Sequence, residues 1–117
     1  EYVEVMWEIM QQKTPDDFVI GTGESRSVRE FVECAFGYAK LDWNKYVEQD
    51  SKYFRPNEVS ELCADSSKSQ KQLKWSPKIH FEEIVKIMVD ADLEFRGLPA
   101  IGEGHKIIKD NFGEWHL

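Results

Sequence analysis

Apolar residues recur at helical spacing in three stretches of the chain. The first stretch ends before Pro15, which cannot continue a helix, and its apolar positions are Val3, Met6, Trp7 and Met10. The second follows Ser27, which forms a capping-box motif with Glu30, and its apolar positions are Val28, Phe31, Val32, Ala35, Phe36 and Ala39. The third precedes Gly97, a natural helix-ending residue, and its apolar positions are Phe81, Ile84, Val85, Met88, Ala91 and Phe95. The pattern predicts three amphipathic helices.

Shorter patterns lie between these helices. Residues 17–24 (DFVIGTGE) form an apolar run closed by two glycines, which is typical of a buried strand with a sharp turn at its end. Residues 41–50 alternate weakly, which allows an edge strand. Ser66 or Ser67 can cap a short helix through Leu73. The order of helices and strands predicts an α/β fold. Because two strands cannot supply a complete sheet, we expect the chain to be part of a longer one.

Two segments show no sustained period. Pro56 fixes its own φ angle and biases Arg55 toward extended backbone, so the segment KYFRPNE is predicted to be a loop. Residues 98–117 contain turns and scattered apolar residues, which indicates a flexible tail or a docking arm of unknown role. The expected organisation is therefore one portion over residues 1–97 and a tail over residues 98–117.

Composition limits the class of protein. The chain has 117 residues, 41% of them hydrophobic, and a net charge of −7, so it can form a core and its acidic balance belongs to its surface. An acidic chain without a basic run is a poor ligand for nucleic acid. No apolar stretch approaches the roughly 20 residues of a membrane span. Cys34 and Cys63 lie far apart without metal-binding spacing, which favours free thiols and a cytoplasmic protein.

Several candidate sites have simpler interpretations. The Gly-Thr-Gly of residues 21–23 lacks the third glycine of a dinucleotide-binding loop and the lysine of a phosphate-binding loop, so it is interpreted as a turn. The histidines are too scattered for a metal site. Arg29 is expected to face solvent or a neighbouring acid, and the two cysteines have no nearby histidine that would activate a nucleophile.

Arg55 and Glu58 form a more specific pair. A guanidinium can bind two phosphate oxygens at once, and a carboxylate three residues later on the same loop can accept hydrogen bonds from both ribose hydroxyls. Together they describe a nucleotide clamp. The residues alone are equally compatible with a surface ion pair, which contributes only about 0 to 1 kcal/mol.

Five stretches occur in an order that resembles the C-terminal third of the GDP-mannose 4,6-dehydratases, which are extended short-chain dehydrogenases/reductases. They are YVEVMWEIMQ, DFVIGTGE, SVREFVECAFGY, KYFRPNEV and the segment from ADSSKSQKQLKWSP to MVDADLE. The resemblance covers about residues 2–95 and leaves the last twenty residues without a counterpart.

The resemblance implies an NADP-dependent lyase that converts GDP-mannose to GDP-4-dehydro-6-deoxymannose on the route to GDP-fucose. In this family the arginine of an R-x-x-[DE] loop binds the diphosphate and its acid binds the ribose, and Arg55 and Glu58 match those positions. The family implies an α/β substrate-binding portion joined to a Rossmann half, GDP-mannose as ligand, no membrane or nucleic acid, and a homo-oligomer as the full-length enzyme.

The chain also departs from the family pattern. It contains neither the Gly-rich NADP motif nor the catalytic Tyr-x-x-x-Lys, so these are expected upstream and the chain alone is expected to be inactive. Ala64 precedes Asp65 where the family has a glycine. An alternative is a non-catalytic interaction module that uses the tail IIKDNFGEWHL to bind a partner.

Overall fold

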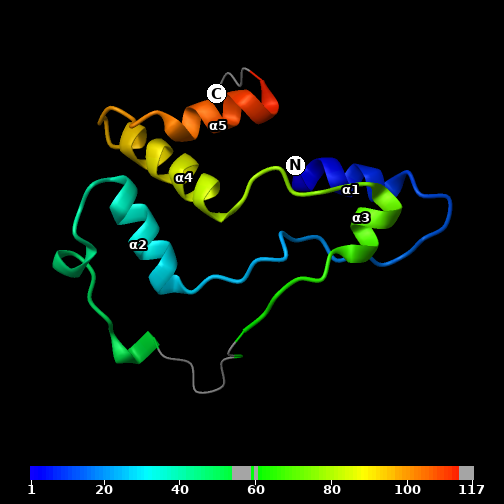
Figure 1. Cartoon of the computed structure of the whole chain (residues 1–117), viewed down its shortest axis with the longest axis horizontal. Coiled ribbons are helices and arrows are strands. Elements are labelled where there is room, and N and C mark those ends of the chain that lie inside the picture. Colours follow the sequence, from blue (N-terminus) through cyan, green and yellow to red (C-terminus); the bar gives the residue numbers. More distant parts are fainter. Residues whose placement is uncertain (54–58, 60, 114–117) are drawn as a thin grey trace. The chain divides into compact units, whose positions relative to one another are not determined.

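The computed structural model describes residues 1–53, 59 and 61–113 (Figure 1). The described residues form the helices α1 (Tyr2–Met10), α2 (Val28–Tyr38), α3 (Ser67–Leu73), α4 (Phe81–Phe95) and α5 (Glu103–Phe112), with short 3-10 helices η1 (Trp43–Lys45) and η2 (Ser51–Tyr53). The chain divides into two compact units. Unit 1 comprises Glu1–Ser25 and Ser60–His80, and unit 2 comprises Arg26–Val59 and Phe81–Leu117. No helix within the described ranges combines the length and apolar character that crossing a membrane requires.

Unit 1 is built around one side of α1. Val5 is fully buried on that side, and the Tyr2 ring lies 6.0 Å from the ring of Trp75, which is itself buried after α3. The backbone N–H of Lys78 donates a hydrogen bond of 2.7 Å to the Glu1 carboxylate, and the Lys78 ammonium lies 3.5 Å from Glu4. These contacts attach the segment after α3 to α1.

The two predicted strands are wrong for the described residues, none of which is assigned to a strand. A strand needs hydrogen bonds to a neighbouring strand. The carbonyl of Val19 instead accepts a hydrogen bond from the Ser69 hydroxyl, 2.5 Å away, so α3 provides the partner. In residues 41–50 the Asp42 carboxylate caps η1 by accepting from the N–H of Asn44. The described part of the chain is helical, and the α/β prediction is not confirmed by it.

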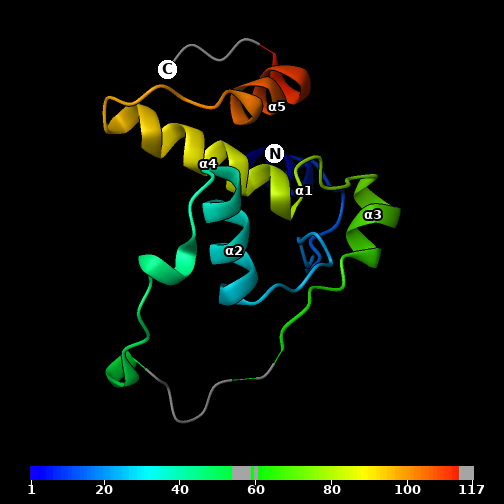
Figure 2. The same ribbon diagram turned by 60° about the vertical axis from the view of Figure 1, so that its left-hand side comes forward.

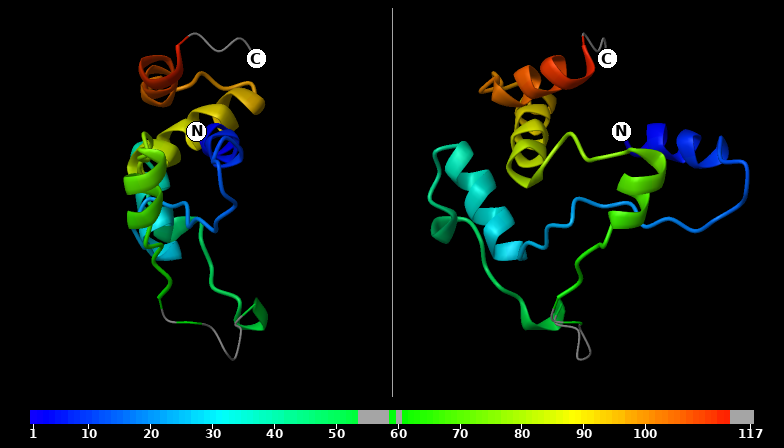
Figure 3. Two further views of the ribbon diagram at one scale, coloured as in Figure 1. Left: turned by 90° about the vertical axis from the view of Figure 1, so that its right-hand side faces the viewer. Right: turned by 45° about the vertical axis from the view of Figure 1, so that its right-hand side comes forward.

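Unit 2 contains α2, α4 and α5, and α5 lies along α4 (Figures 2 and 3). The predicted capping box is confirmed at the start of α2. The Ser27 hydroxyl accepts from the N–H of Glu30 at 3.2 Å, and the Glu30 carboxylate accepts from the N–H of Ser27 at 2.7 Å. At the end of α4, Gly97 has φ of 73°, and the N–H of Leu98 donates back to the carbonyl of Leu93. Local sequence signals therefore set these ends of α2 and α4.

The expectation of an irregular tail is wrong for Glu103–Phe112, which forms α5. Gly102 occupies the N-cap position and offers no side-chain cap, so the sequence lacks the usual signal for a helix start. The missing cap is supplied from α4, because the buried carboxylate of Asp90 accepts hydrogen bonds from the N–H groups of Ile101, Gly102 and Gly104. The start of this helix depends on a tertiary contact.

Candidate functional site

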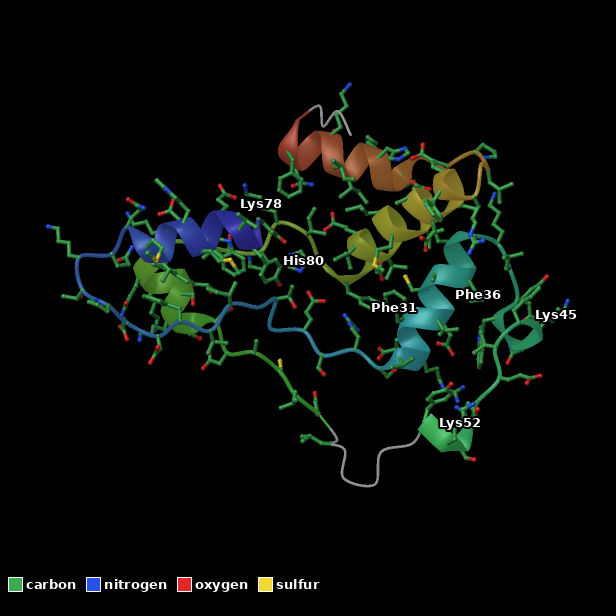
Figure 4. All side chains as sticks on the ribbon, turned by 180° about the vertical axis from the view of Figure 1, so that it is seen from behind. Phe31, Phe36, Lys45, Lys52, Lys78 and His80 are labelled. Carbon is green, nitrogen blue, oxygen red and sulfur yellow. The ribbon has the colours of Figure 1, made fainter. Side chains whose placement is uncertain are left out.

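The predicted clamp residues Arg55 and Glu58 lie outside the described residues. The segment before them ends in η2, where the ammonium of Lys52 lies 3.2 Å from the Asp50 carboxylate and 4.8 Å from the centre of the Tyr53 ring (Figure 4). Tyr53 is exposed. A cation and an aromatic ring therefore stand at the surface immediately before the predicted loop.

A pocket of about 340 Å³ lies beside this approach, on the α2 and η1 side of unit 2. Its lining residues are Val28, Arg29, Val32, Trp43, Val47, Glu48 and Gln49. The Arg29 guanidinium lies 5.4 Å from the centre of the Trp43 ring, an attractive cation–π distance. Arg29 was expected to face solvent or an acid, and the structure confirms that it is exposed and adds the contact with an aromatic ring. Sequence reasoning missed this group because Trp43 lay in a segment interpreted as a strand.

A second pocket of about 260 Å³ lies between α2 and α4. It is lined by Ala35, Phe36, Ala39, Leu41, Val89, Asp92, Leu93 and Arg96. The Phe36 ring, which is labelled in Figure 4, also stacks against Tyr46 with ring centres 6.0 Å apart. This pocket is apolar apart from Asp92 and Arg96, which gives it few groups that could orient a polar ligand.

The Gly-Thr-Gly turn does not fit a dinucleotide. A side chain at Gly21 would come within 2.5 Å of the Ala64 Cβ atom, so the Ala64 methyl group packs closely against this turn. The Cys63 thiol donates to the carbonyl of Gly23 at 3.0 Å, and Gly23 has φ of 76°. The structure supports a turn here, packed against the residue that replaces the expected family glycine.

The N-terminus of α2 is equally unsuited to a pyrophosphate. A helix N-terminus binds anions through its free N–H groups. The carboxylate of Glu30 already lies there, and the hydrogen bonds from the Ser27 backbone and side chain hold the Glu30 pKa below its usual value. An added anion would be repelled by this charge. The glycine turn and the start of α2 are both already engaged in contacts within the chain.

Asp90 is the most completely enclosed ionisable group in the described part of the chain. Burial raises its pKa, but hydrogen bonds from Gly104, Ile101, Gly102 and the Tyr38 hydroxyl outweigh burial, and the net shift is downward. The Tyr38 hydroxyl lies 3.1 Å from one Asp90 oxygen and accepts from the N–H of Glu103. Burial raises the pKa of Tyr38, so it remains a neutral donor. Sequence analysis missed this group because its partners are distant in sequence, and its geometry is that of a helix cap.

Two of the remaining candidates, His80 and His105, lie beside carboxylates. His80 lies 2.8 Å from Glu24, and His105 lies 3.2 Å from Glu94. Cys34 is half-buried, and burial raises the pKa of its thiol. No cluster of three or more potential metal ligands occurs among the residues with described positions.

The family profile and the individual relatives that resemble this chain agree on one family. The sequence profile of the family described as GDP-mannose 4,6 dehydratase matches residues 1–88. GDP-mannose 4,6 dehydratase 1 of Arabidopsis thaliana is 52% identical over 94 residues, which cover 80% of this chain and 26% of that protein. The Dictyostelium discoideum enzyme of the same name is 43% identical over 112 residues, covering 81% of this chain and 32% of the relative. The Homo sapiens enzyme is 41% identical over 111 residues, covering 80% and 30%. The chain thus spans between a quarter and a third of these relatives.

Proposed function

Since the chain belongs to the GDP-mannose 4,6-dehydratase family, we propose that it binds the GDP end of GDP-mannose as one part of a longer, NADP-dependent dehydratase. The observation that carries the proposal is the family match over residues 1–88, which includes both predicted clamp residues. Arg55 binds the diphosphate through its planar guanidinium, and Glu58 accepts hydrogen bonds from the ribose hydroxyls.

The remaining parts of the enzyme lie outside this chain in the proposal. NADP, which takes a hydride from the substrate and returns it, is bound by a Rossmann portion of the longer protein, which also holds the residues that expel water. The whole protein is an α/β short-chain dehydrogenase/reductase of the GDP-fucose pathway, a cytoplasmic homo-oligomer without membrane or nucleic-acid ligands. In that setting residues 17–24 gain a neighbouring strand. On this proposal the chain alone is expected to show no turnover of GDP-mannose.

The alternative of a non-catalytic interaction module has weaker support. It depended on a tail that was free to bind a partner. The part of that tail from Ile107 to Phe112 lies in α5, where Ile107, Ile108 and Phe112 are partly buried within unit 2. These side chains are already used by the chain itself, so the enzyme proposal is preferred.

The test is GDP binding by a chimera in which this chain replaces the 94 residues that it matches in the Arabidopsis thaliana relative. Arg55→Ala is expected to weaken GDP binding about ten- to a hundredfold, because a charge-assisted hydrogen bond contributes about 1.5 to 3 kcal/mol. Calorimetry would measure the dissociation constant. Lys52→Ala is the matched control, since it removes an exposed positive charge from the same approach and should leave the affinity unchanged. An Arg55→Ala protein that binds GDP normally would refute the clamp.

Glu58→Gln tests the ribose contact separately. The amide still accepts a hydrogen bond but lacks the charge that strengthens it, so a smaller loss is expected than for Arg55→Ala. Binding of a 2′,3′-dideoxy guanosine diphosphate should be unaffected by this substitution. Equal losses for both nucleotides would show that Glu58 does not contact the ribose.

A further inference from the structure

The helices α2, α4 and α5 of unit 2 meet at one side chain, that of Tyr38. Tyr38 is the last residue of α2, and its hydroxyl lies 3.1 and 3.2 Å from the two carboxylate oxygens of Asp90 on α4. The same hydroxyl accepts a hydrogen bond of 3.1 Å from the N–H of Glu103, the first residue of α5. A single hydroxyl therefore connects α2 to α4 through its proton and to α5 through its oxygen.

The segment that contains α5, residues 99–113, is called the C-terminal strap. Its helix lies along α4 (Figures 2 and 3). A Cβ atom at Gly104 would lie 2.6 Å from the carbonyl oxygen of Lys86, so the backbones of the two helices are in direct contact at this glycine. The Lys86 ammonium also lies 2.7 Å from the Glu103 carboxylate. The strap is therefore seated directly on the backbone of α4.

The strap and the end of α2 share the same acceptor, Asp90. Its carboxylate is fully buried and accepts hydrogen bonds from the N–H groups of Ile101, Gly102 and Gly104, at 2.9, 3.0 and 2.8 Å. A carboxylate can remain charged in such a place only when donors surround it. Without the strap, Asp90 would be open to water on the side that these N–H groups cover. Water would then compete with the Tyr38 hydroxyl for the carboxylate and weaken their hydrogen bond.

We infer that the C-terminal strap is a conformational lock on α2: it encloses Asp90, and the enclosed carboxylate holds the C-terminal end of α2 through the Tyr38 hydroxyl. The family profile ends at residue 88, within α4, so Asp90 and the strap both lie beyond the region that the profile matches. Val28 and Arg29, at the other end of α2, line the larger pocket, so the strap fixes the helix that carries one wall of that pocket. The inference is independent of GDP binding, because all of its contacts lie within unit 2.

The lock acts on one end of α2 only. Near the other end, the Phe31 ring lies 6.2 Å from the ring of Phe81 on α4, a contact in which the strap takes no part. Loss of the lock should therefore free the amides of residues 35–39, in the last turn of α2, and leave the turn around Phe31 in place. Amide hydrogen exchange distinguishes the two ends, because it reports local opening segment by segment.

The first experiment removes the hydroxyl alone, in the Arabidopsis thaliana chimera described above. Tyr38→Phe keeps the ring, which contacts the Lys86 ammonium at 5.8 Å. A hydrogen bond to a charged group is strong enough to change an opening equilibrium about tenfold, so the amides of residues 35–39 and of α5 should exchange about tenfold faster. Unchanged exchange in Tyr38→Phe would overturn the inference.

Tyr46→Phe is the matched control. The Tyr46 ring also packs on α2, stacked against Phe36, but its hydroxyl forms no hydrogen bond with any described residue. Removing this hydroxyl should leave exchange in α2 and α5 unchanged. If both variants accelerated exchange equally, the effect would belong to loss of a tyrosine hydroxyl in general, and the lock would be refuted.

The second experiment removes the strap. A chimera whose chain ends at Leu98 keeps the hydrogen bond from Leu98 to Leu93 that ends α4. Its residues 35–39 should exchange as fast as those of Tyr38→Phe. Adding Tyr38→Phe to this shortened chimera should change exchange by less than about twofold, because the hydroxyl and the strap act as one unit. A tenfold effect of Tyr38→Phe with and without the strap would show that Tyr38 and Asp90 hold α2 unaided, which would overturn the inference.

The full-length proteins decide the matter if the shortened chimera is unfolded, which faster exchange in α1 and α3 would reveal. Tyr38→Phe must then accelerate exchange both in residues 35–39 and in α5, because the lock joins these two segments. Faster exchange confined to one of them would overturn the inference.

Discussion

The α4–α5 pair of unit 2 and helix α1 of unit 1 differ in how far contacts within the unit satisfy their side chains and backbone groups. In the α4–α5 pair, Asp90 meets the N–H groups that begin α5, and the Tyr38 hydroxyl completes the cluster. Helix α1 buries Val5 but leaves Trp7 and Met10 exposed. The buried polar groups of the pair form hydrogen bonds within unit 2, whereas α1 buries apolar side chains within unit 1 on one side only. The comparison shows that contacts within a unit account for the buried polar groups of the α4–α5 pair, whereas they cover only part of the apolar surface of α1.

Removing the Asp90 carboxylate should have the largest effect on the α4–α5 pair. Asp90→Ala leaves the buried N–H of Gly104 and the partly buried N–H groups of Ile101 and Gly102 without their acceptor, and because one buried unsatisfied donor costs about 1 to 3 kcal/mol, a loss of roughly 3 kcal/mol is expected. Urea unfolding and amide exchange in α5 would measure it. Asp92→Ala, an exposed acid on the same helix, is the control and should change stability by less than about 0.5 kcal/mol. An α5 that keeps its exchange protection in Asp90→Ala would show that the pair is held by other contacts.

A second prediction concerns how closely α5 approaches α4. A side chain at Gly104 would lie 2.6 Å from the carbonyl oxygen of Lys86 and 2.7 Å from the Ile87 Cα atom. Because both atoms are backbone, Gly104→Ala should displace α5 and cost about 1 to 3 kcal/mol. Differential scanning calorimetry would record a lower unfolding temperature.

Gly37→Ala is the matched substitution on α2. Apart from the backbone of α2 itself and the two neighbouring residues, no atom lies within 4 Å of the added methyl group, so the helix should gain about 0.5 to 1 kcal/mol from the higher helix propensity of alanine. If both alanine variants changed stability by the same amount, the close approach of α5 to α4 would not be energetically important.

A third prediction is that the Asp90 cluster makes the stability of α5 depend on pH. The folded-state pKa of Asp90 lies below its unfolded value, because hydrogen bonds from the cluster outweigh burial. This contribution is fully present above the unfolded pKa of about 3.9 and is lost as the pH falls through the folded pKa. Between pH 5 and pH 3, roughly the range that spans the unfolded value, wild-type α5 should lose protection more steeply than α5 in Asp90→Asn. Parallel pH profiles for the two proteins would contradict this account.

The sequence predicted those elements whose signals are local. The capping box of Ser27 and Glu30, the periodic apolar positions of α4 and the glycine at 97 are all contained within a few residues of the structures that they specify. They were confirmed for that reason. A helix in α5 was missed because its cap is supplied by Asp90, which no local pattern around Gly102 reveals.

The errors at the two expected strands have another physical cause. Apolar content and flanking glycines indicate burial, but a strand exists only when a second strand accepts its hydrogen bonds. Residues 17–24 carry the composition without the partner in the described chain. The sequence analysis missed the pocket at Arg29 and Trp43 because it assigned residues 41–50, which contain η1, to a possible strand. Arg55 and Glu58 remain predictions from the family motif.

The smallest predicted effect compares the two units at helix ends that share an unusual feature. Lys40 follows α2 with φ of 57°, and Lys74 follows α3 with φ of 55°. A non-glycine residue in the left-handed conformation is strained by roughly 1 to 2 kcal/mol. Replacing it with glycine removes this strain, but the greater conformational freedom of glycine in the unfolded state cancels part of the gain. Lys40→Gly should therefore raise the stability of α2, and Lys74→Gly that of α3, by about 0.5 to 1 kcal/mol. Amide exchange in each helix would measure the gain.

Gly97→Ala provides the reverse test at the end of α4, where φ is 73°. It should cost about 1 kcal/mol, because alanine would have to adopt the conformation that glycine adopts without strain. At Lys40 the N–H of Leu41 donates to the carbonyl of Phe36 at 2.8 Å, the same bond pattern that Leu98 and Leu93 form around Gly97. The two substitutions should therefore shift stability in opposite directions. A loss of protection in α2 of Lys40→Gly would mean that the lysine side chain contributes more to this helix end than its backbone strain removes.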